Sequence, residues 1–448
     1  MKNFTLEAVC RACGGKWTGP APTNTELTAV TTDSRAVTPG CLFAAIPGER
    51  VDGHDFIASA LEKGAACALA RRLPAGVTGN VILVPDTVAA LQSAAAYYRA
   101  QFDIPVLGIT GSVGKTTAKE MTASVLAQRC RVHKTAGNFN NDLGVPITLF
   151  GLDDTHEAAV VEMGVSHPGD MLRLAEMVRP TMALYTVIGH AHLEFLKSRE
   201  GILAEKSVMN QYLPDNGIVL CNGDDDLLSA MACTQRKLTF GLSGRCEVRA
   251  EDIRQTPDGG TDCTISAPGR SIPVHISAYG EHMVYAALEG AAVGIALGLS
   301  DEEIIRGIAA YTPVGRRARR VETGKFTVID DCYNANPTST ASALRSLAGA
   351  EGRRVCILGD MLELGEEAEK LHFETGALAR SLGVELVLTA GPLSREIARG
   401  AGQEEHWFPD RAALCAALPG LLRSGDTVLV KASHSMRFEE ITSAIEAL

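Results

Sequence analysis

Short apolar runs alternate with amphipathic stretches along most of the chain. The apolar runs lie at residues 81–84, 106–109, 159–161, 183–188, 218–220, 326–329, 355–358, 386–388 and 428–430. Helical patterns lie between many of them, at residues 119–128, 171–177 and 368–380. Continuous apolar strands separated by helices are typical of α/β proteins with parallel sheets. We therefore predict an α/β fold with right-handed crossovers and helices on both faces of the sheets.

Two breaks divide this pattern. One lies at residues 101–105, and the other at residues 312–315, just before a run of arginines. A chain of 448 residues suggests three domains of about 150 residues each. We predict domains at 1–102, 103–314 and 315–448. Residues 241–276 alternate polar and apolar positions between glycine-rich turns, which predicts antiparallel strands attached to the middle domain.

Composition narrows the class of protein. The net charge of -11 argues against non-specific binding to nucleic acid or to an anionic membrane, because both need a basic surface. No apolar run approaches the ~18 residues of a membrane span, and the first residues lack the apolar core of a signal peptide. The 12 cysteines form only one C-x-x-C pair, so reduced thiols in a cytoplasmic protein are the expectation.

The clearest motif is a phosphate loop. The apolar run at 106–109 leads into Gly-Ser-Val-Gly-Lys-Thr-Thr at residues 111–117, and a helical pattern follows. Backbone N–H groups of such a loop bind phosphate oxygens, the lysine adds a charge, and the next hydroxyl binds Mg²⁺. Ile109 stands where the strict pattern has glycine, so this is a compressed form. It predicts a nucleoside triphosphate site made by Gly111, Ser112, Val113, Gly114, Lys115, Thr116 and Thr117.

Polar residues follow several other apolar runs. They are Glu162, His190, His192, Asp330, Asp331, Asp360 and Lys431. Ligands bind at the carboxyl ends of strands in open α/β sheets, so these side chains are candidates for one site. Glu162 and Thr116 offer the oxygen ligands that Mg²⁺ prefers, and His192 is a possible third ligand. Taken alone, His192 is more typical of a histidine with a structural role. Lys206, taken alone, is more typical of a lysine on the surface of a helix. The amides of residues 138–141 are equally typical of turns.

Taken together, the motifs resemble the Mur ligases of peptidoglycan synthesis over essentially the whole chain. They are Asp33-Ser34-Arg35, PGCLFAAIPGERVDGHDF (39–56), GITGSVGKTTAKE (108–120), GNFNNDLGVP (137–146), VEMG (161–164), GHAHLEF (189–195), DDCYNANPTS (330–339), GDMLELGEEA (359–368) and VKASHSMRFEE (430–440). The resemblance implies a central ATPase-like domain with a parallel sheet, a smaller α/β domain that binds UDP, and a Rossmann-like carboxyl-terminal domain.

The resemblance also implies a reaction. The chain is similar to the family member that uses ATP to join D-alanyl-D-alanine to UDP-N-acetylmuramoyl-tripeptide. That reaction passes through an acyl phosphate and gives ADP. ATP and Mg²⁺ are the implied cofactors, and a cytoplasmic monomer is expected. Lys115, Glu162, His192 and Lys206 match catalytic residues. Thr116, Glu162, His192 and a carbamylated Lys206 match metal-binding residues.

The remaining matches concern ATP and the uridine substrate. The nucleotide contacts implied in the carboxyl-terminal domain are Arg316, Asp331, Asn334 and Asn336. The substrate contacts implied are Ser34, Arg35, Asn138, Asn140 and Asn141. Met283 and Ala286 replace two asparagines with which the family holds adenine, Val187 replaces another asparagine, and His434 replaces an arginine. A related ligase with another substrate pair, or a nucleotide-binding relative that has lost catalysis, are the alternatives.

Overall fold

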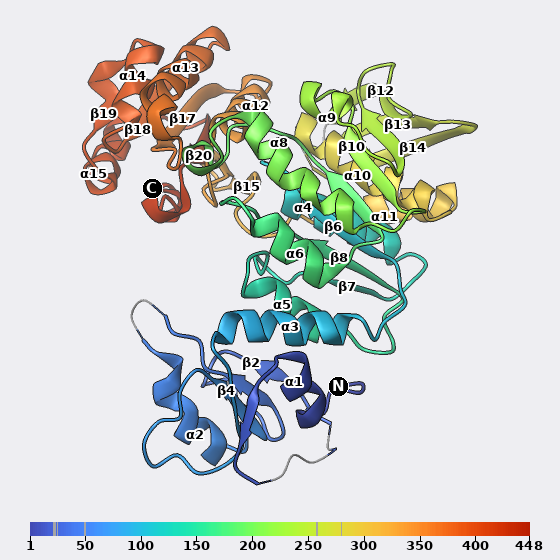
Figure 1. Cartoon of the computed structure of the whole chain (residues 1–448). Coiled ribbons are helices and arrows are strands. Elements are labelled where there is room, and N and C mark those ends of the chain that lie inside the picture. Colours follow the sequence, from blue (N-terminus) through green and yellow to red (C-terminus); the bar gives the residue numbers. More distant parts are fainter. Residues whose placement is uncertain (21–23, 25, 49–50, 257–258, 279) are drawn as a thin grey trace.

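The computed structural model describes residues 1–20, 24, 26–48, 51–256, 259–278 and 280–448. These residues form three β-sheets that follow one another along the chain (Figure 1). The blue amino-terminal sheet, the cyan-to-yellow central sheet and the orange-to-red carboxyl-terminal sheet each carry their own helices. Residues 49 and 50, in the segment 39–56 that contributes to the family resemblance, lie outside the described residues.

The first sheet has five strands in the order β1-β5-β4-β3-β2. Its strands are β1 (Lys16–Thr18), β2 (Val30–Thr31), β3 (Leu42–Ala44), β4 (Cys67–Ala70) and β5 (Val81–Leu83). β2 to β5 pair in parallel, whereas β1 runs antiparallel to β5. The helices of this part are α1 (Leu6–Ala12), α2 (Ile57–Glu62) and α3 (Thr87–Arg99).

Helix α3 joins the first domain to the second. It packs against α5 and α6 of the central domain as well as against α1 and β4 (Figure 1). The Tyr98 ring lies 5.1 Å from the Phe4 ring and 6.0 Å from the Phe150 ring, and its hydroxyl donates to the Leu152 carbonyl oxygen over 2.7 Å. All of these side chains belong to one apolar core. The first and central domains therefore share buried apolar surface, which stabilises their contact.

The central sheet has nine strands in the order β14-β13-β12-β11-β10-β9-β6-β8-β7. They are β6 (Val106–Thr110), β7 (Val132–Lys134), β8 (Ala158–Glu162), β9 (Met182–Tyr185), β10 (Ile218–Asn222), β11 (Arg236–Gly241), β12 (Val248–Gln255), β13 (Thr261–Ala267) and β14 (Arg270–Ile276). The strands from β7 to β12 pair in parallel, and β12, β13 and β14 pair antiparallel.

Helices cover both faces of this sheet. They are α4 (Lys115–Leu126), α5 (Gly144–Phe150), α6 (Asp170–Val178), α7 (Leu193–Leu196), α8 (Arg199–Ser207), α9 (Asp226–Ala230), α10 (Glu281–Ala296) and α11 (Asp301–Ala309). Alternate residues of the strands enter different cores, since successive side chains point to opposite faces. Val161 of β8 joins the core that includes α3, α5 and α6, whereas Val160 joins the core that includes α4, α10 and α11.

The third sheet has six strands in the order β15-β16-β20-β17-β18-β19, parallel except for β15. They are β15 (Arg319–Glu322), β16 (Thr327–Asp330), β17 (Arg353–Gly359), β18 (Leu386–Ala390), β19 (Trp407–Phe408) and β20 (Asp426–Lys431). The helices are α12 (Pro337–Ala348), α13 (Ala368–Ser381), α14 (Ser394–Ala401), α15 (Arg411–Leu421) and α16 (Glu439–Glu446). Two apolar clusters form the core of this domain on the two faces of the sheet.

The predicted fold class is confirmed. Each apolar run named above lies in or overlaps a strand, and the predicted antiparallel strands at the edge of the central sheet are β12, β13 and β14. Each sheet lies inside one predicted domain, while the boundaries at 102/103 and 314/315 stay predictions. All 12 cysteines are described and free. No helix in the described ranges combines the length and apolarity needed to cross a bilayer.

Candidate active site

The phosphate loop lies at the carboxyl edge of the central sheet, between β6 and α4. Gly111 and Gly114 have φ angles of 153° and 87°, which favour glycine. A Cβ atom on Gly111 would lie 2.0 Å from the Thr186 hydroxyl oxygen, so no larger residue fits there. The Ser112 N–H donates to the Val187 carbonyl oxygen over 2.8 Å. The residues that directly follow β9 therefore fix the shape of the loop.

The amino terminus of α4 opens directly from this loop. Gly114 is the residue before the helix and supplies no side-chain cap. The N–H groups of the first turn, which includes Lys115, Thr116 and Thr117, therefore have no intrahelical partner and suit an anion. The Lys115 ammonium donates to the Gly111 carbonyl oxygen over 2.8 Å. Burial lowers the pKa of Lys115, and the nearby Glu162 carboxylate opposes that shift.

Glu162, the last residue of β8, is the centre of a buried polar cluster. The Thr116 hydroxyl donates to its carboxylate over 2.9 Å, and the Asn140 amide donates over 2.8 Å. The Lys119 ammonium lies 3.8 Å from the same carboxylate and is fully buried. A hydroxyl beside a carboxylate at the end of the phosphate loop is an oxygen donor set that Mg²⁺ accepts, with nucleotide phosphates completing its shell. These residues therefore fit the magnesium ion that the family resemblance implies.

The three predicted amides of the loop 138–141 have different surroundings. Asn140 contacts Glu162 as described above, and the Asn141 side chain accepts from the N–H of Gly144, the first residue of α5, over 2.9 Å. Asn138 is exposed, and its backbone carbonyl accepts from the Asn140 N–H over 2.7 Å. Asn140 therefore belongs to the phosphate side of the site, whereas Asn141 has a structural task that it performs without a ligand.

His192 directly precedes α7 and has a left-handed backbone with a φ of 60°. Its Nδ1 lies 2.5 Å from the Glu363 carboxylate in the carboxyl-terminal domain. Glu363 also has a positive φ of 63°, and its carbonyl oxygen accepts from the Glu194 N–H over 3.1 Å. The hydrogen bond from His192 holds the pKa of Glu363 below its usual range. Two strained residues from different domains thus meet here, and His192 is bonded to Glu363 rather than to the Glu162 cluster.

Lys206 lies in α8 with an exposed fraction of 1%. In the part of the chain that the structure describes, its ammonium has no hydrogen bond or ion pair. Burial lowers its pKa well below the usual range, and the Lys115 charge lowers it further. The interpretation of Lys206 as a surface lysine is thus wrong. Its position follows from α8 packing with Ile202 and Lys206 turned inward.

The carboxyl-terminal domain presents a second polar cluster, at the ends of β16 and β20. Lys431 is buried and donates to the Asp331 carboxylate over 2.6 Å and to the Asn334 carbonyl oxygen over 2.9 Å. Asn336 caps α12 by accepting from the Ser339 N–H over 2.9 Å. Asp331 and Asn334 are thereby held in place, and α12 begins beside them.

Arg316 differs from this cluster. Its guanidinium donates over 2.8 Å to Asp330, which is fully buried, and Arg316 does not line the cavity described below. The adjacent Arg317 does line it, with its guanidinium 3.8 Å from the centre of the Tyr333 ring. Ser34 and Arg35 lie in the first domain, away from this cavity. The Arg35 guanidinium bonds to Asp33 and lowers the pKa of that carboxyl to about 2.

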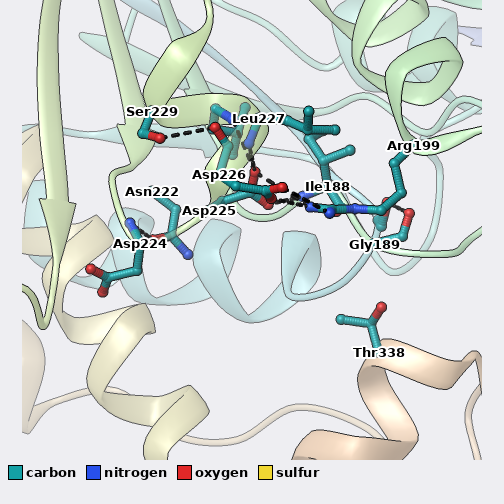
Figure 2. A network of polar contacts seen from close by, with 12 residues as sticks. Ile188, Gly189, Arg199, Asn222, Asp224, Asp225, Asp226, Leu227, Ser229 and Thr338 are labelled. Carbon is teal, nitrogen blue, oxygen red and sulfur yellow. Dashed lines mark hydrogen bonds and ion pairs between the residues drawn. The ribbon is translucent and has the colours of Figure 1, made fainter.

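A network of aspartates anchors the loop that carries His190 and His192 (Figure 2). Asp225 accepts from the Ile188 N–H over 2.7 Å and from the Leu228 N–H over 2.9 Å, so it joins this loop to α9. Arg199 donates to the Ile188 carbonyl oxygen over 2.9 Å and also binds Asp226. On the opposite side, the hydroxyl of Thr338 at the start of α12 lies below Gly189 in Figure 2, where it accepts from the His190 N–H.

One cavity of about 1340 Å³ joins these groups between the central and the carboxyl-terminal domains. The predicted site residues that line it are Ser112, Val113, Gly114, Lys115, Thr116, Thr117, Asn140, Asn141, Glu162, His192, Asp331, Asn334 and Asn336. The predicted residues that do not line it are Gly111, Lys206, Arg316, Asn138, Ser34 and Arg35. The phosphate loop therefore faces the polar ends of β16 and β20 across open space.

The sequence pattern left several residues of this site unassigned. Lys119 lies one helical turn after Lys115, so helical spacing alone places it on the same face. Asp225 follows the apolar run at 218–220 and could have been grouped with the other acids at strand ends. Glu363 carries no local signal, because its partner His192 is distant in sequence and belongs to another domain.

The fold and the site define a three-domain α/β protein with a phosphate loop that opens into a cavity between two domains. Family profiles match the chain in three segments: "Mur ligase family, catalytic domain" at residues 26–99, "Mur ligase middle domain" at 109–294, and "Mur ligase, glutamate ligase domain" at 316–434. Together they cover most of its length. The chain therefore belongs to the Mur ligase family.

Named relatives are similar over the full length. The UDP-N-acetylmuramoyl-tripeptide–D-alanyl-D-alanine ligase of Escherichia coli (strain K12) is 36% identical over 453 residues, covering 100% of this chain and 99% of the relative. A crystal structure of MurF from Acinetobacter baumannii superposes with a TM-score of 0.93 at 30% identity and 99% coverage of both chains. MurF from Thermotoga maritima in complex with ADP has a TM-score of 0.84 at 29% identity, covering 94% of this chain and 97% of that one.

Proposed function

We propose that this enzyme uses ATP to join D-alanyl-D-alanine to UDP-N-acetylmuramoyl-tripeptide, releasing ADP and phosphate in peptidoglycan synthesis. The observation that carries the proposal is the single cavity that the phosphate loop shares with the polar ends of β16 and β20. A cavity between two domains gives room for a nucleotide, a peptide carboxylate and an incoming amine at once. The full-length similarity to ligases of this named activity supports the choice of substrates.

The reaction must activate a carboxylate, because a carboxylate at neutral pH repels nucleophiles and has no leaving group. A carboxylate oxygen of the tripeptide attacks the γ-phosphorus of ATP, the bond to the β,γ-bridging oxygen breaks, and ADP leaves. The amine of D-alanyl-D-alanine then attacks the acyl phosphate and loses a proton. The tetrahedral intermediate expels phosphate, and the new amide bond remains.

Positioning and charge stabilisation account for most catalysis of phosphoryl transfer. The N–H groups at the start of α4 and the ammonium of Lys115 are placed to bind the oxygens of the transferred phosphate. Thr116 and Glu162 are the residues that would hold Mg²⁺, and this ion supplies Lewis-acid stabilisation of the phosphate charge when bound. Lys119 and Asn140 keep the Glu162 carboxylate oriented towards Thr116.

We further propose that Lys206 is carbamylated, as the resemblance implies. Carbamylation needs a neutral amine, and burial beside the Lys115 charge favours the neutral form. The product is an anion, which the neighbouring Lys115 cation stabilises. The resemblance implies that such a carboxylate and His192 would hold a second divalent ion, a role for which His192 would have to leave Glu363.

The other predicted residues have supporting roles in the proposal. Asp331, Asn334 and Asn336 line the cavity opposite the phosphate loop, which supports the proposal that they contact ATP. Asn140 and Asn141 line its other wall. Ser34 and Arg35 remain candidates for the uridine nucleotide of the substrate, a part that extends far from the reacting carboxylate into the first domain.

Phosphate release tests this function directly. The purified protein is mixed with ATP, Mg²⁺ and UDP-N-acetylmuramoyl-tripeptide, with and without D-alanyl-D-alanine, and free phosphate is followed over time. Steady release is expected only when the dipeptide is present, because the acyl phosphate otherwise has no acceptor. Release that is independent of the dipeptide, or a product whose mass lacks the dipeptide, would overturn the assignment. L-alanyl-L-alanine is the matched control for the acceptor.

A further inference from the structure

Glu289 is a buried acid that the reaction described above does not use. It lies in α10 with an exposed fraction of 4%. Across the described ranges its carboxyl has no hydrogen bond and no ion pair, yet it lines the cavity between the two domains. Burial alone raises its pKa well above the usual range, and no charged neighbour contributes. A polar group left this way costs folding free energy unless water or a ligand in the cavity satisfies it.

Helical geometry places Glu289 on the face of α10 that meets the cavity. His282 and Ala286 lie seven and three positions before it, so the three side chains fall on one side of the helix. All three line the cavity. Helix α10 runs beside α4, since a Cβ atom on Gly290 would lie 3.1 Å from the Met121 Cγ atom. One continuous space therefore connects the phosphate loop to Glu289.

The two ends of that space differ in charge. Lys115 and Glu162 influence one another at the phosphate end. Neither of them, nor any other charged group, shifts the pKa of Glu289. Ala286 lies one helical turn before Glu289 and is apolar, and His282 lies one turn further back on the same face. A buried pocket joined to a phosphate site suits the base of a nucleotide.

The chemistry of a neutral carboxyl matches the amino edge of adenine. It offers one O–H donor and one carbonyl acceptor side by side. Adenine presents an amino donor beside a ring-nitrogen acceptor, the pattern with which a side-chain amide forms a bidentate pair. Guanine presents two acceptors, N7 and O6, on the corresponding edge. A carboxyl with one donor satisfies the adenine edge fully and leaves one guanine acceptor unpaired.

We propose that Glu289 binds the edge of the adenine base of ATP, accepting from the 6-amino group and donating to a ring nitrogen. Glu289 is thereby a specificity-determining residue for the nucleotide. This inference rests on the proposed function only in taking ATP as the nucleotide of the cavity. It explains why a buried acid without a protein partner is present on this helix face.

Nucleotide binding in the absence of both other substrates tests the inference. The dissociation constants of ATP and of purine riboside triphosphate, which lacks the 6-amino group, are measured by titration calorimetry with Mg²⁺. The wild-type protein is expected to bind ATP about tenfold more tightly than the analogue. Glu289→Ala is expected to bind both with equal affinity. Glu289→Gln keeps one donor and one acceptor and is expected to retain the preference for ATP.

Two comparisons separate this role from a structural one. Met283→Ala removes a cavity-lining side chain without base hydrogen bonds, so it is expected to change both affinities alike. Glu289→Ala removes an unpaired buried carboxyl and is expected to unfold at a temperature no lower than the wild type. An unchanged preference for ATP in Glu289→Ala, or equal binding of both nucleotides by the wild type, would overturn the inference. Dipeptide-dependent phosphate release by the wild type would then still support the proposed function.

Discussion

Replacement of Lys115 by alanine is expected to lower the rate of dipeptide-dependent phosphate release by about a thousandfold. The ammonium lies within the phosphate loop, 2.8 Å from the Gly111 carbonyl oxygen, and is the cation that the first turn of α4 presents to the cavity. Its loss removes charge stabilisation where the γ-phosphate is transferred. The measurement is the steady-state rate at saturating concentrations of all three substrates.

The fold should survive this change. Lys115 makes one hydrogen bond to the loop. Burial lowers its pKa, so keeping this lysine charged costs more folding free energy than keeping a surface lysine charged. Circular dichroism and the unfolding temperature should match the wild type closely. Lys2→Ala, which removes an exposed ion pair with Asp154, is the matched control and should keep full activity. Substantial activity in Lys115→Ala would refute the role of the phosphate loop.

Lys206→Ala is expected to be the second most damaging change, lowering the same rate by about a hundredfold or more. The proposed carbamate supplies a carboxylate at this buried position. Short carboxylic acids such as acetate fit the space left by the lysine side chain and restore an anion there. Part of the activity should therefore return as acetate is added, without any need for bicarbonate.

The control for this experiment is Lys325→Ala, an exposed lysine in the carboxyl-terminal domain. It should be fully active, and acetate should have no effect on it. Mass spectrometry of the native wild-type protein should also show an added CO₂ that is absent from Lys206→Ala. Wild-type behaviour of Lys206→Ala would exclude the carbamate, while loss of activity without rescue by any short acid would indicate a purely structural lysine.

Local patterns in the sequence are sufficient to predict the strands and helices. They also predict the half of the candidate site that contains the phosphate loop and Glu162. The apolar run ending at Ile109 and the glycines at 111 and 114 specify strand, loop and helix within a short segment. Glu162 likewise directly follows the apolar run at 159–161 and ends the strand. The phosphate loop and the position of Glu162 can both be predicted, because residues close together in the sequence determine the backbone geometry and the burial of one strand.

Contacts between domains cannot be predicted from such local patterns. The pairing of His192 with Glu363 joins residues 171 positions apart. The burial of Lys206 depends on how α8 packs, and its own segment is typical of a helix surface. Arg316 was predicted as a nucleotide contact, whereas its guanidinium binds Asp330 and the adjacent Arg317 lines the cavity. The nucleotide contact of Arg316 stays a prediction, and the sequence of an arginine-rich run does not show which of its side chains enters the cavity.

Oxygen transfer from substrate to phosphate tests the central claim, activation of a carboxylate as an acyl phosphate, most directly. UDP-N-acetylmuramoyl-tripeptide is labelled with ¹⁸O in both oxygens of its reacting carboxylate and converted with ATP and D-alanyl-D-alanine. One labelled oxygen bridges carbon and phosphorus in the intermediate and leaves with the phosphate. Mass analysis should therefore find one ¹⁸O atom in each phosphate formed and the other in the new amide. Unlabelled phosphate, released while the amide forms, would contradict the account.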